Sequence, residues 1–463
     1  MKNINSWSNI NWSVVNLNVY RLQLRIFRAS VQKDWGKVHK LQKLLLSSES
    51  AKFVATRRSE RWIPSLNVLS LDKMMGMSEP EKLDLAINLD IDGHITKKST
   101  KKLRLSQLLF IKDKAKQELA LLALIPQWEA NFDTYNYGFH SEKSSLSAVE
   151  VLLSILSKGK KWVLQVDLLD CFASIDHDFL IKKCNTFPKM EAQLKVWLRD
   201  NVLASNQIQT EAVSSFFVNV ALCGIENLLN EFASRLLKVG YSNSEVLNFV
   251  GYGCSFLVLC SDREVSEKVD TILKSFFQNL RLDLRLAKVR IVHTYEKELY
   301  PPGFDFLGFN IIHKDRWIYV RNRNTKMFPE REFITIINPS KAEIKTHLKE
   351  LKKIVTSHGG LSQERIIDLL NPLIEQWSLS KRKYSTSKLF QKLDSCLYKY
   401  LWDWAKKRHP LMTEIKIKSS YFHKIGSRSS VFAKKVIVNN KEFYKKLSSH
   451  SSIKAKEHTY IKT

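Results

Sequence analysis

The sequence has little of the residues that define fibrous or disordered chains. Its 463 residues include only 14 Gly and 10 Pro, whereas 24 Phe, 14 Tyr and 11 Trp can supply hydrophobic cores. Collagen-like and low-complexity classes are therefore excluded. The six cysteines form no CxxC pair, so the sequence supports neither a zinc site nor a secreted disulfide framework, and a reducing compartment fits best.

Long apolar runs and acidic residues are also scarce. No run of about 18 apolar residues occurs, so we expect no membrane span. The chain has 46 Asp and Glu against 74 Lys and Arg, a formal net charge of +28. Residues 301–463 alone carry 33 basic and 14 acidic side chains, an excess of 19. This charge indicates a polyanionic partner, with nucleic acid favoured over an anionic membrane surface, and it places the main binding face in the C-terminal third.

Apolar periodicity predicts a mixture of helices and strands in two or three domains. Helices are expected over 17–32, 38–57, 80–88, 103–135, 144–156, 192–204, 225–239, 265–280, 340–357, 361–376 and 386–407. Strands are expected over 162–166, 289–294 and within 303–337, with a hairpin over 248–260. The tail after residue 430 is basic and weakly patterned.

The predicted hairpin has an unusual turn. Residues 249–259 read FVGYGCSFLVL, two apolar strands around a tight turn, as in the palm of a polymerase. In a working palm the turn carries two adjacent aspartates that hold divalent metals, because Mg²⁺ is bound by carboxylate and phosphate oxygens. Here these positions are Cys254 and Ser255. The pattern predicts a palm that has lost its polymerase activity.

Several segments, in this order, resemble the group II intron-encoded reverse transcriptase/maturase family. They are residues 22–29, 41–48, 126–132, 136–139, 167–172 (DLLDCF), 303–309 (GFDFLGF), 339–341 (PSK), 370–372 (LNP), 404–410 (WAKKRHP) and 421–422 (YF). The resemblance implies an α+β fold, with reverse-transcriptase-like fingers and palm followed by an α-helical maturase (X/thumb) domain. The boundaries expected from it are an N-terminal helical extension over 1–100, fingers and palm over 101–335, the maturase domain over 336–430 and a basic tail over 431–463.

The sequence departs from the family at the palm. Asp167 matches a catalytic carboxylate, but Ala173 stands where the family usually has aspartate, and Cys254 and Ser255 replace the metal-binding pair. We therefore expect no catalytic residue, no bound metal and no cofactor. Asp167 is either a remaining metal ligand or a strand-end carboxylate that caps a turn. Nothing in the sequence indicates a depressed pKa, and hence a reactive thiol, for Cys254.

Clusters of basic residues are the candidate RNA contacts. They are Arg57, Arg58, Lys341, Lys381, Arg382, Lys383, Lys406, Lys407, Arg408 and His409. Lys and Arg neutralise phosphates, and an adjacent aromatic such as Tyr384 offers a stacking surface for an unpaired base. A solvated charged face is the alternative for each cluster, and the cations of residues 406–408 would also complement the dipole of a helix C-terminus.

The resemblance implies a splicing cofactor and not an enzyme. The expected partner is a precursor RNA carrying a group II or related intron, with no membrane and no small-molecule substrate. Two alternatives stay open: an active reverse transcriptase with atypical metal ligands, and a general RNA-binding protein without intron specificity. The N-terminus has no signal or transit character. Together with a similarity to euglenid plastid maturases, this predicts an organelle-encoded plastid protein, with a mitochondrion or a bacterial cytoplasm as the alternatives.

Overall fold

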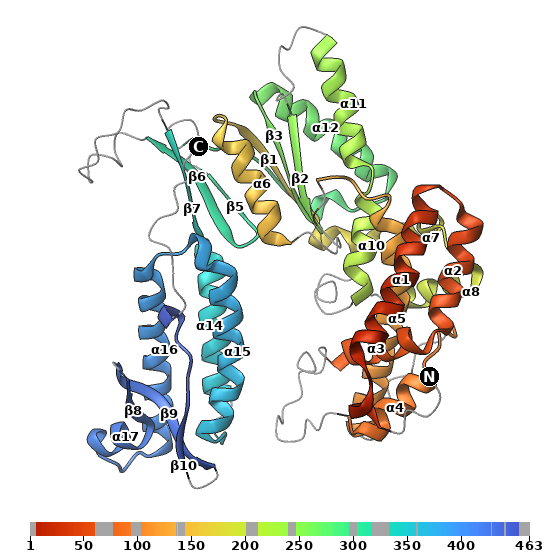
Figure 1. The fold of residues 1–463 in the computed structure, drawn as a ribbon. Coiled ribbons are helices and arrows are strands. Elements are labelled where there is room, and N and C mark those ends of the chain that lie inside the picture. Colours follow the sequence, from red (N-terminus) through yellow and green to blue (C-terminus); the bar gives the residue numbers. More distant parts are fainter. Residues whose placement is uncertain are drawn as a thin grey trace. The chain divides into compact units, whose positions relative to one another are not determined.

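The computed structural model contains two compact units (Figure 1). Unit 1 comprises Met1–Leu152 and Lys161–Ile291, and unit 2 comprises Leu153–Lys160 and Val292–Thr463. The structure describes residues 6–60, 77–93, 103–135, 137, 144–200, 212–238, 247–295, 303–315, 333–357, 360–426, 428–438 and 441–452. Helices and antiparallel strands occur in both units, which confirms the α+β class.

Helix α5 (Leu103–Glu129) forms the centre of the N-terminal part of unit 1. Most of its described side chains are buried, the apolar Leu119, Leu122 and Leu124 together with the polar Gln117 and Glu118. A helix of this kind is stable only when other elements cover it. The helices of this region are α1 (Trp12–Val31), α2 (Trp35–Ser47), α3 (Glu49–Ser59), α4 (Glu79–Ile87) and α10 (Ala212–Leu222). All of these except α4 pack directly against α5.

One predicted helix, over residues 38–57, is wrong because it is two helices. Ser48 has an extended backbone (φ −70°, ψ 125°), ends α2 and occupies the N-cap position of α3. Glu49 in the first turn of α3 complements the positive end of the helix dipole. The apolar pattern runs across the break through Leu45, Leu46 and Ala51, so periodicity alone could not locate it.

A four-stranded sheet in the order β2-β3-β1-β4 forms the palm of unit 1. Strand β3 pairs antiparallel with both β1 and β2, so the predicted strand and hairpin are confirmed. Helix α12 packs on this sheet through Val265, Val269 and Leu273. The strands of this sheet are β1 (Trp162–Asp167), β2 (Leu247–Tyr252), β3 (Ser255–Cys260) and β4 (Lys288–His293). The helices of this part of the chain are η4 (Leu169–Ser174), α7 (His177–Cys184), α8 (Pro188–Arg199), α11 (Ile225–Lys238) and α12 (Arg263–Asn279). Helix α6 (Ser145–Ser157) begins in unit 1 and ends in unit 2.

Unit 2 contains a three-stranded antiparallel sheet and three long helices (Figure 1). These are β5 (Phe304–Phe306), β6 (Phe309–Asp315), β7 (Phe333–Pro339), α14 (Lys341–Ser357), α15 (Gln363–Lys381) and α16 (Ser387–Arg408). Helix α14 packs against both α15 and α16 around buried Leu351, Ile366 and Leu401. Because β5–β7 group with these helices, the division between the two compact units lies before Val292. The domain boundary expected at residue 336 stays a prediction.

The segment after residue 428 is a β-structure, which corrects the expected weakly patterned tail. Strand β9 (Arg428–Val438) pairs antiparallel with β8 (Phe422–Ile425) and β10 (Lys441–Lys446). The ring of Phe432 on β9 is buried and lies parallel to that of Tyr421, with centroids 6.2 Å apart. The segment therefore completes the core of unit 2.

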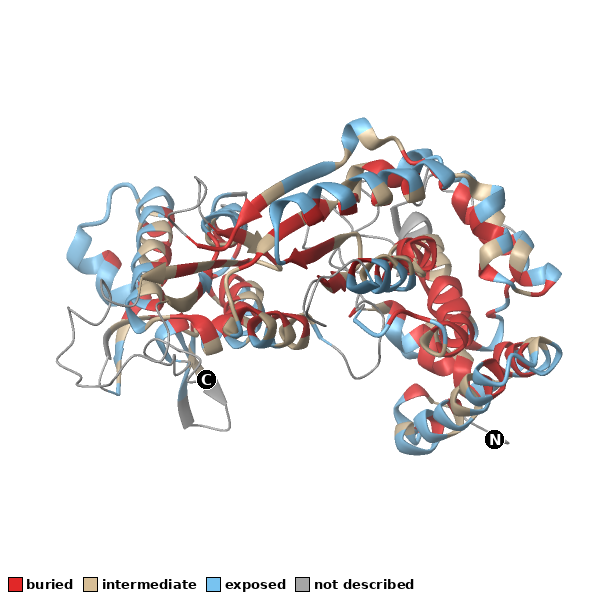
Figure 2. Cartoon of the chain, turned by 90° about the horizontal axis from the view of Figure 1, so that it is seen from above, coloured by how far each residue is buried: buried red, intermediate tan, exposed pale blue. Residues whose placement is uncertain are grey.

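Among the residues that the structure describes, one helical stretch, Val213–Lys238, is long and apolar enough to cross a membrane. However, 67% of its apolar window is buried inside the protein, as in the core helix of a folded domain. Figure 2 shows the same arrangement elsewhere in the described part of the chain, with buried residues on the inner faces of helices and strands and exposed residues on the outer faces.

Candidate nucleic-acid interface

The β2–β3 turn places its neutral side chains beside the strand-end aspartate. Asp167, at the end of β1, lies opposite Ser255 in the antiparallel register with β3. Gly253, which has a φ of +60°, and Cys254 form the turn itself. The amide of Leu168 donates to the carbonyl of Cys254 at 3.0 Å. The turn therefore has the geometry of a palm hairpin, and the carboxylate beside it, Asp167, comes from β1 and not from the hairpin itself.

The nearby carboxylates already have partners within the protein. Asp167 Oδ1 accepts a hydrogen bond from the amide of Leu169 at 3.1 Å, as expected for a turn-capping carboxylate. Asp170 Oδ2 lies 3.1 Å from the ammonium of Lys288. The described residues contain no group of three or more His, Cys, Asp or Glu side chains that could hold a metal ion. Two Mg²⁺ ions would need more hard oxygen ligands than this arrangement provides, so the residues do not fit the metals of a polymerase palm.

Cys254 is a protonated thiol near neutral pH. Burial raises its pKa to about 11, and the charge of Asp167 acts in the same direction. A thiol needs a lowered pKa to act as a nucleophile or metal ligand. The expectation that Cys254 is unreactive agrees with this environment. Ala173, the other altered palm position, is exposed in η4 and carries no polar group.

The predicted cations of the N-terminal region lie at the end of α3. Arg57 and Arg58 are both exposed in the last turn of this helix. The guanidinium of Arg57 lies 4.4 Å from the ring centroid of Trp12, a cation–π contact that holds the side chain in place. Both residues remain accessible to a phosphate.

A larger group of cations lies on helices α1 and α2, which precede α3 in the chain, and was not predicted from the sequence. Helices α1 and α2 contain no Asp or Glu, and their exposed basic side chains are Arg21, Arg25, Arg28, Lys37, Lys40 and Lys43. The three arginines are spaced by four and three residues, so they share one face of α1. This spacing was readable in the sequence, whereas their exposure was not.

The cations at the end of α16 have mixed environments. Lys406, Lys407 and Arg408 are exposed, and Lys406 pairs with Glu414. The Nη1 atom of Arg408 donates to the carbonyl of Leu361 at 2.7 Å. These residues can reach a phosphate while also complementing the helix dipole.

His409 faces the protein more than the solvent. Its Nε2 atom lies 2.6 Å from the hydroxyl of Tyr421, and the side chain is half-buried. Trp404, one turn earlier, is buried and packs edge-on against Tyr421 with ring centroids 5.4 Å apart. His409 therefore contributes first to the aromatic core around Trp404.

Lys381 is buried in unit 2, which corrects its expected place on the RNA surface. Its Nζ atom lies 3.4 Å from Glu343 Oε1 and 3.3 Å from the carbonyl oxygen of Leu307, to which it donates. It also lies 4.3 Å from the centroid of the Phe309 ring. Burial lowers the pKa of Lys381, against the raising effect of Glu343. We therefore remove Lys381 from the expected RNA contacts.

The neighbours of Lys381 divide between the interior and the surface. Tyr384 is buried and meets Phe309 edge-on with ring centroids 5.4 Å apart, so the expected stacking of a base on Tyr384 is wrong. Arg382 is exposed. Lys383 is half-buried, with its ammonium 5.5 Å from the Tyr384 ring centroid. Only Arg382 and Lys383 of this cluster remain candidate phosphate contacts.

Helix α14 carries a lysine stripe, of which the sequence analysis named only Lys341. Its exposed members are Lys341, Lys345, Lys349, Lys352 and Lys353. Spacings of three and four residues place most of them along one face of the helix. The stripe lies in the highly basic C-terminal third and gives unit 2 an extended cationic surface.

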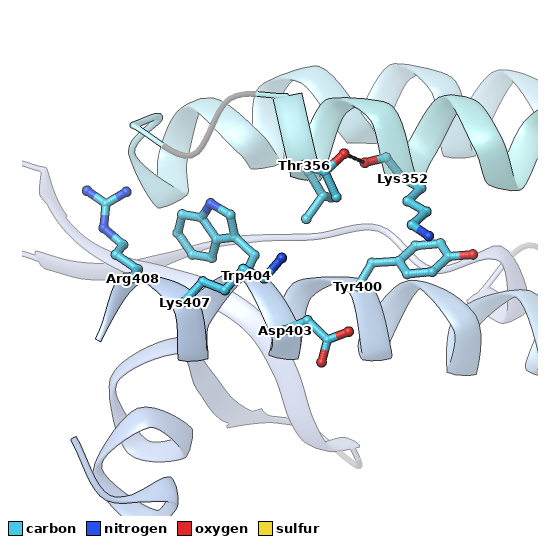
Figure 3. Close-up of a pocket in the computed structure, with 8 residues that line it drawn as sticks. Lys352, Thr356, Tyr400, Asp403, Trp404, Lys407 and Arg408 are labelled. Atoms are coloured by element: carbon cyan, nitrogen blue, oxygen red, sulfur yellow. Dashed lines mark hydrogen bonds between the residues drawn. The ribbon is translucent and has the colours of Figure 1, made fainter. Parts of the chain in front are cut away.

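A pocket of about 320 Å³ lies between α14 and α16 (Figure 3). Its lining residues are Lys352, Val355, Thr356, Tyr400, Asp403, Trp404, Lys407 and Arg408. Cationic and aromatic side chains thus meet at one concave site in unit 2. Lys407, expected to contact RNA, is among them.

Matches to known families follow the order of these parts. Residues 7–86 match the N-terminal domain of reverse transcriptase, and residues 95–311 match the reverse transcriptase (RNA-dependent DNA polymerase) domain. Residues 344–422 match the maturase-specific domain of group II introns. The chain belongs to the group II intron maturase family. The maturase-specific match covers α15, α16 and most of α14, the elements that carry the lysine stripe and the pocket.

Relatives of this maturase occur in Euglena. The chain is 23% identical over 408 residues to "Maturase-like protein 1" of Euglena longa, covering 82% of the chain and 79% of that protein. It is 25% identical over 404 residues to "Maturase-like protein 1" of Euglena gracilis, covering 82% of the chain and 78% of that protein. Among solved structures, a telomerase from Candida albicans is similar at 13% identity over 68% of the chain and 59% of that protein. Its TM-score of 0.27 is too low to bear on function.

Proposed function

We propose that this maturase binds a group II or related intron in a precursor RNA and promotes its splicing by stabilising the catalytic RNA fold. The main support for the proposal is the difference between the maturase-specific domain and the palm of the same chain. The maturase-specific domain presents an exposed lysine stripe, whereas the palm turn has Cys254 and Ser255 in place of metal-binding carboxylates. The surface suited to RNA is present, and the ligands needed for nucleotidyl transfer are missing.

The physical basis of the activity is preferential binding. RNA helices that fold together bring phosphates close to one another, and Lys and Arg side chains reduce their repulsion. A protein that binds the native RNA more tightly than misfolded forms shifts the population toward the native form by that difference in affinity. The cations of α1, α2 and α14 are placed on exposed helix faces where they can do this. The intron RNA itself would supply the chemistry of splicing.

The palm would then serve as a scaffold. Its sheet packs on α12 and joins the N-terminal helices through a continuous core. The carboxylates Asp167 and Asp170 are engaged by a backbone amide and by Lys288. We infer that reverse-transcriptase activity has been lost and that the domain is retained because it holds the RNA-binding helices in place.

We also propose that the protein works in the plastid where its gene is encoded, with a mitochondrion as the alternative compartment. The two Euglena relatives support an organelle, and the six free cysteines are typical of a reducing interior. Immunoelectron microscopy with an antibody to the protein separates the two compartments.

The proposed function is tested by immunoprecipitating the tagged full-length protein from its own compartment and sequencing the bound RNA. We expect enrichment of one or a few intron-containing precursors over their spliced products. The matched control is an untagged strain. Recovery of all transcripts in proportion to their abundance would contradict intron specificity and favour a general RNA-binding protein.

A further inference from the structure

The pocket between α14 and α16 combines the two chemical features of a nucleotide site. Lys352 and Lys407 contribute ammonium groups, and Tyr400 and Trp404 contribute aromatic rings (Figure 3). The Nζ atom of Lys352 lies 5.7 Å from the centroid of the Tyr400 ring. A phosphate and a planar base joined by a sugar need cations and a ring within a few ångströms of one another, and here both line one cavity.

A buried donor supports a ligand at this site. Trp404 is only 5% exposed, and its indole Nε1 finds no hydrogen-bond acceptor among the residues that the structure describes. A buried donor without an acceptor is costly, and such groups are uncommon in folded proteins. Trp404 belongs to the pocket lining, so a polar molecule bound in the pocket is a source for the missing acceptor.

The pocket walls are fixed by contacts that do not involve a ligand. The hydroxyl of Thr356 donates to the carbonyl of Lys352 at 2.9 Å (Figure 3). The guanidinium of Arg408 lies 5.3 Å from the Trp404 ring centroid and is anchored to the carbonyl of Leu361. A largely preformed site loses less conformational freedom on binding. These contacts give the pocket its shape before RNA arrives.

We propose that this pocket receives one unpaired nucleotide of the intron RNA, an inference that rests on the proposed function and specifies part of its RNA-binding site. Tyr400 stacks with the base, and Lys352 and Lys407 bind the adjoining phosphates. Asp403 accepts a hydrogen bond from an N–H group of the base or from the 2′-hydroxyl. The pocket volume of about 320 Å³ suits a single small ligand and is too small for a helix of RNA.

An acidic protein segment is the competing occupant, and the composition of the pocket disfavours it. A carboxylate-rich peptide would gain from Lys352 and Lys407 but would be repelled by Asp403, and it would leave Tyr400 without a planar partner. A nucleotide uses the cations, the ring and the carboxylate together. The charge and the aromatic lining therefore favour RNA.

The test compares full-length variants for binding to a short single-stranded oligoribonucleotide and to an RNA duplex of the same sequence. The pocket variants are Tyr400→Ala, Tyr400→Phe and the double substitution Lys352→Ala/Lys407→Ala. The matched control is Lys392→Ala/Lys399→Ala, which removes two exposed charges from α16 outside the pocket. Thermal unfolding of each variant shows whether it is folded.

We expect Tyr400→Ala to weaken single-strand binding by about tenfold, the effect of a lost base stack, while Tyr400→Phe retains it. The pocket double variant should weaken single-strand binding several-fold more than the control double variant, and the two should affect duplex binding equally. Equal effects of the two double variants on the single strand would overturn the proposal.

The experiments distinguish a failure of the nucleotide pocket from a failure of the proposed function. If the wild-type protein captures intron-containing precursors but the pocket variants behave like the control, only the nucleotide pocket is wrong. If the wild-type protein shows no intron preference, the proposed function is wrong whatever the pocket variants do. The lysine substitutions change exposed side chains, so the test does not depend on the stability of Tyr400→Ala.

Discussion

Individual side chains decide what the palm of this maturase can hold. At the β2–β3 turn, Cys254 is kept protonated by burial and by the charge of Asp167. Asp170 is drawn toward the ammonium of Lys288, whose pKa is raised by this contact. A neutral thiol, a hydroxyl and carboxylates that already have partners do not form a site for two divalent ions.

We predict that the full-length protein does not extend a primer on an RNA template with either Mg²⁺ or Mn²⁺. The reason is the absence of carboxylates at Cys254 and Ser255. Asp167→Ala is the matched control, because it removes the one retained position and defines the background of the assay. Extension by the wild-type protein above this background would show that atypical ligands support catalysis.

The histidine pair of unit 2 predicts a loss of stability in mild acid. Burial, with His450 adding to it, lowers the pKa of His347 to about 3 from an ordinary 6.5. Its Nε2 lies 2.9 Å from that of His450, and its ring stacks on Trp377. Between about pH 6.5 and 3 the unfolded chain therefore binds a proton that the folded chain does not. The free energy of unfolding therefore decreases as the pH is lowered through this range, by up to about 2 kcal/mol at pH 5.

The measurement is the thermal unfolding midpoint of the wild type and of His347→Phe from neutral pH to about pH 5. The variant keeps a ring against Trp377 but cannot titrate, so its midpoint should fall less steeply over this range. Parallel curves for the two proteins would show that His347 does not cause the loss. His423→Phe, which alters a half-exposed histidine on β8, is the control.

At the scale of elements, exposed cations on helix faces form the proposed RNA-binding surface. Helices α1 and α2 contain no acidic residue, and α14 carries lysines at spacings of three and four residues. Exposed cations on a rigid helix bind phosphates at fixed spacing and lose little conformational freedom of the backbone in doing so. We propose that these elements, more than the short basic clusters at helix ends, supply the electrostatic part of RNA binding.

We predict that Arg21→Gln/Arg25→Gln/Arg28→Gln weakens RNA binding and reduces the slope of log K against log salt by about 2 to 3, since up to three phosphate contacts are lost. The measurement is a binding titration at several salt concentrations. The control is Lys189→Gln/Lys195→Gln/Lys268→Gln, whose ammonium groups already pair with acidic side chains. An equal change of slope in both triple variants would contradict a special role for α1.

Sequence patterns located most elements but not all of their limits. The palm strand, the hairpin and the three long helices of unit 2 were predicted because their periodicity is strong and is bounded by polar residues. The break at Ser48 was missed because apolar residues continue on both sides of it. The strand β9 was missed because Lys434 and Lys435 interrupt its alternation, and only the core of unit 2 shows why Phe432 is buried.

The candidate site was predictable only in part for a related reason. The replacement of the metal-binding aspartates by Cys254 and Ser255 could be recognised from the residue types alone, without a structure. Whether a lysine faces solvent depends on packing between distant segments. Lys381 is buried because α15 ends against Leu307 and Glu343, which lie far away in the sequence. The pocket formed by α14 and α16 could not be predicted for the same reason, because its lining residues come from segments that are distant in the sequence.

At the scale of the whole molecule, the distribution of charge and chemistry supports a protein that acts by binding. The net charge of +28 is carried largely by the C-terminal third, which contains the maturase-specific domain. The palm retains its sheet and core without the ligands of a polymerase. We propose that the protein changes the behaviour of an RNA by stabilising one of its folds.

The most direct test is splicing of a captured precursor RNA in vitro, with and without the full-length protein, over a series of Mg²⁺ concentrations. The account predicts that the protein permits splicing at Mg²⁺ concentrations where the RNA alone is inactive, and that Asp167→Ala is as effective as the wild type. If the protein binds the precursor tightly but leaves its Mg²⁺ requirement and splicing rate unchanged, the central claim is contradicted.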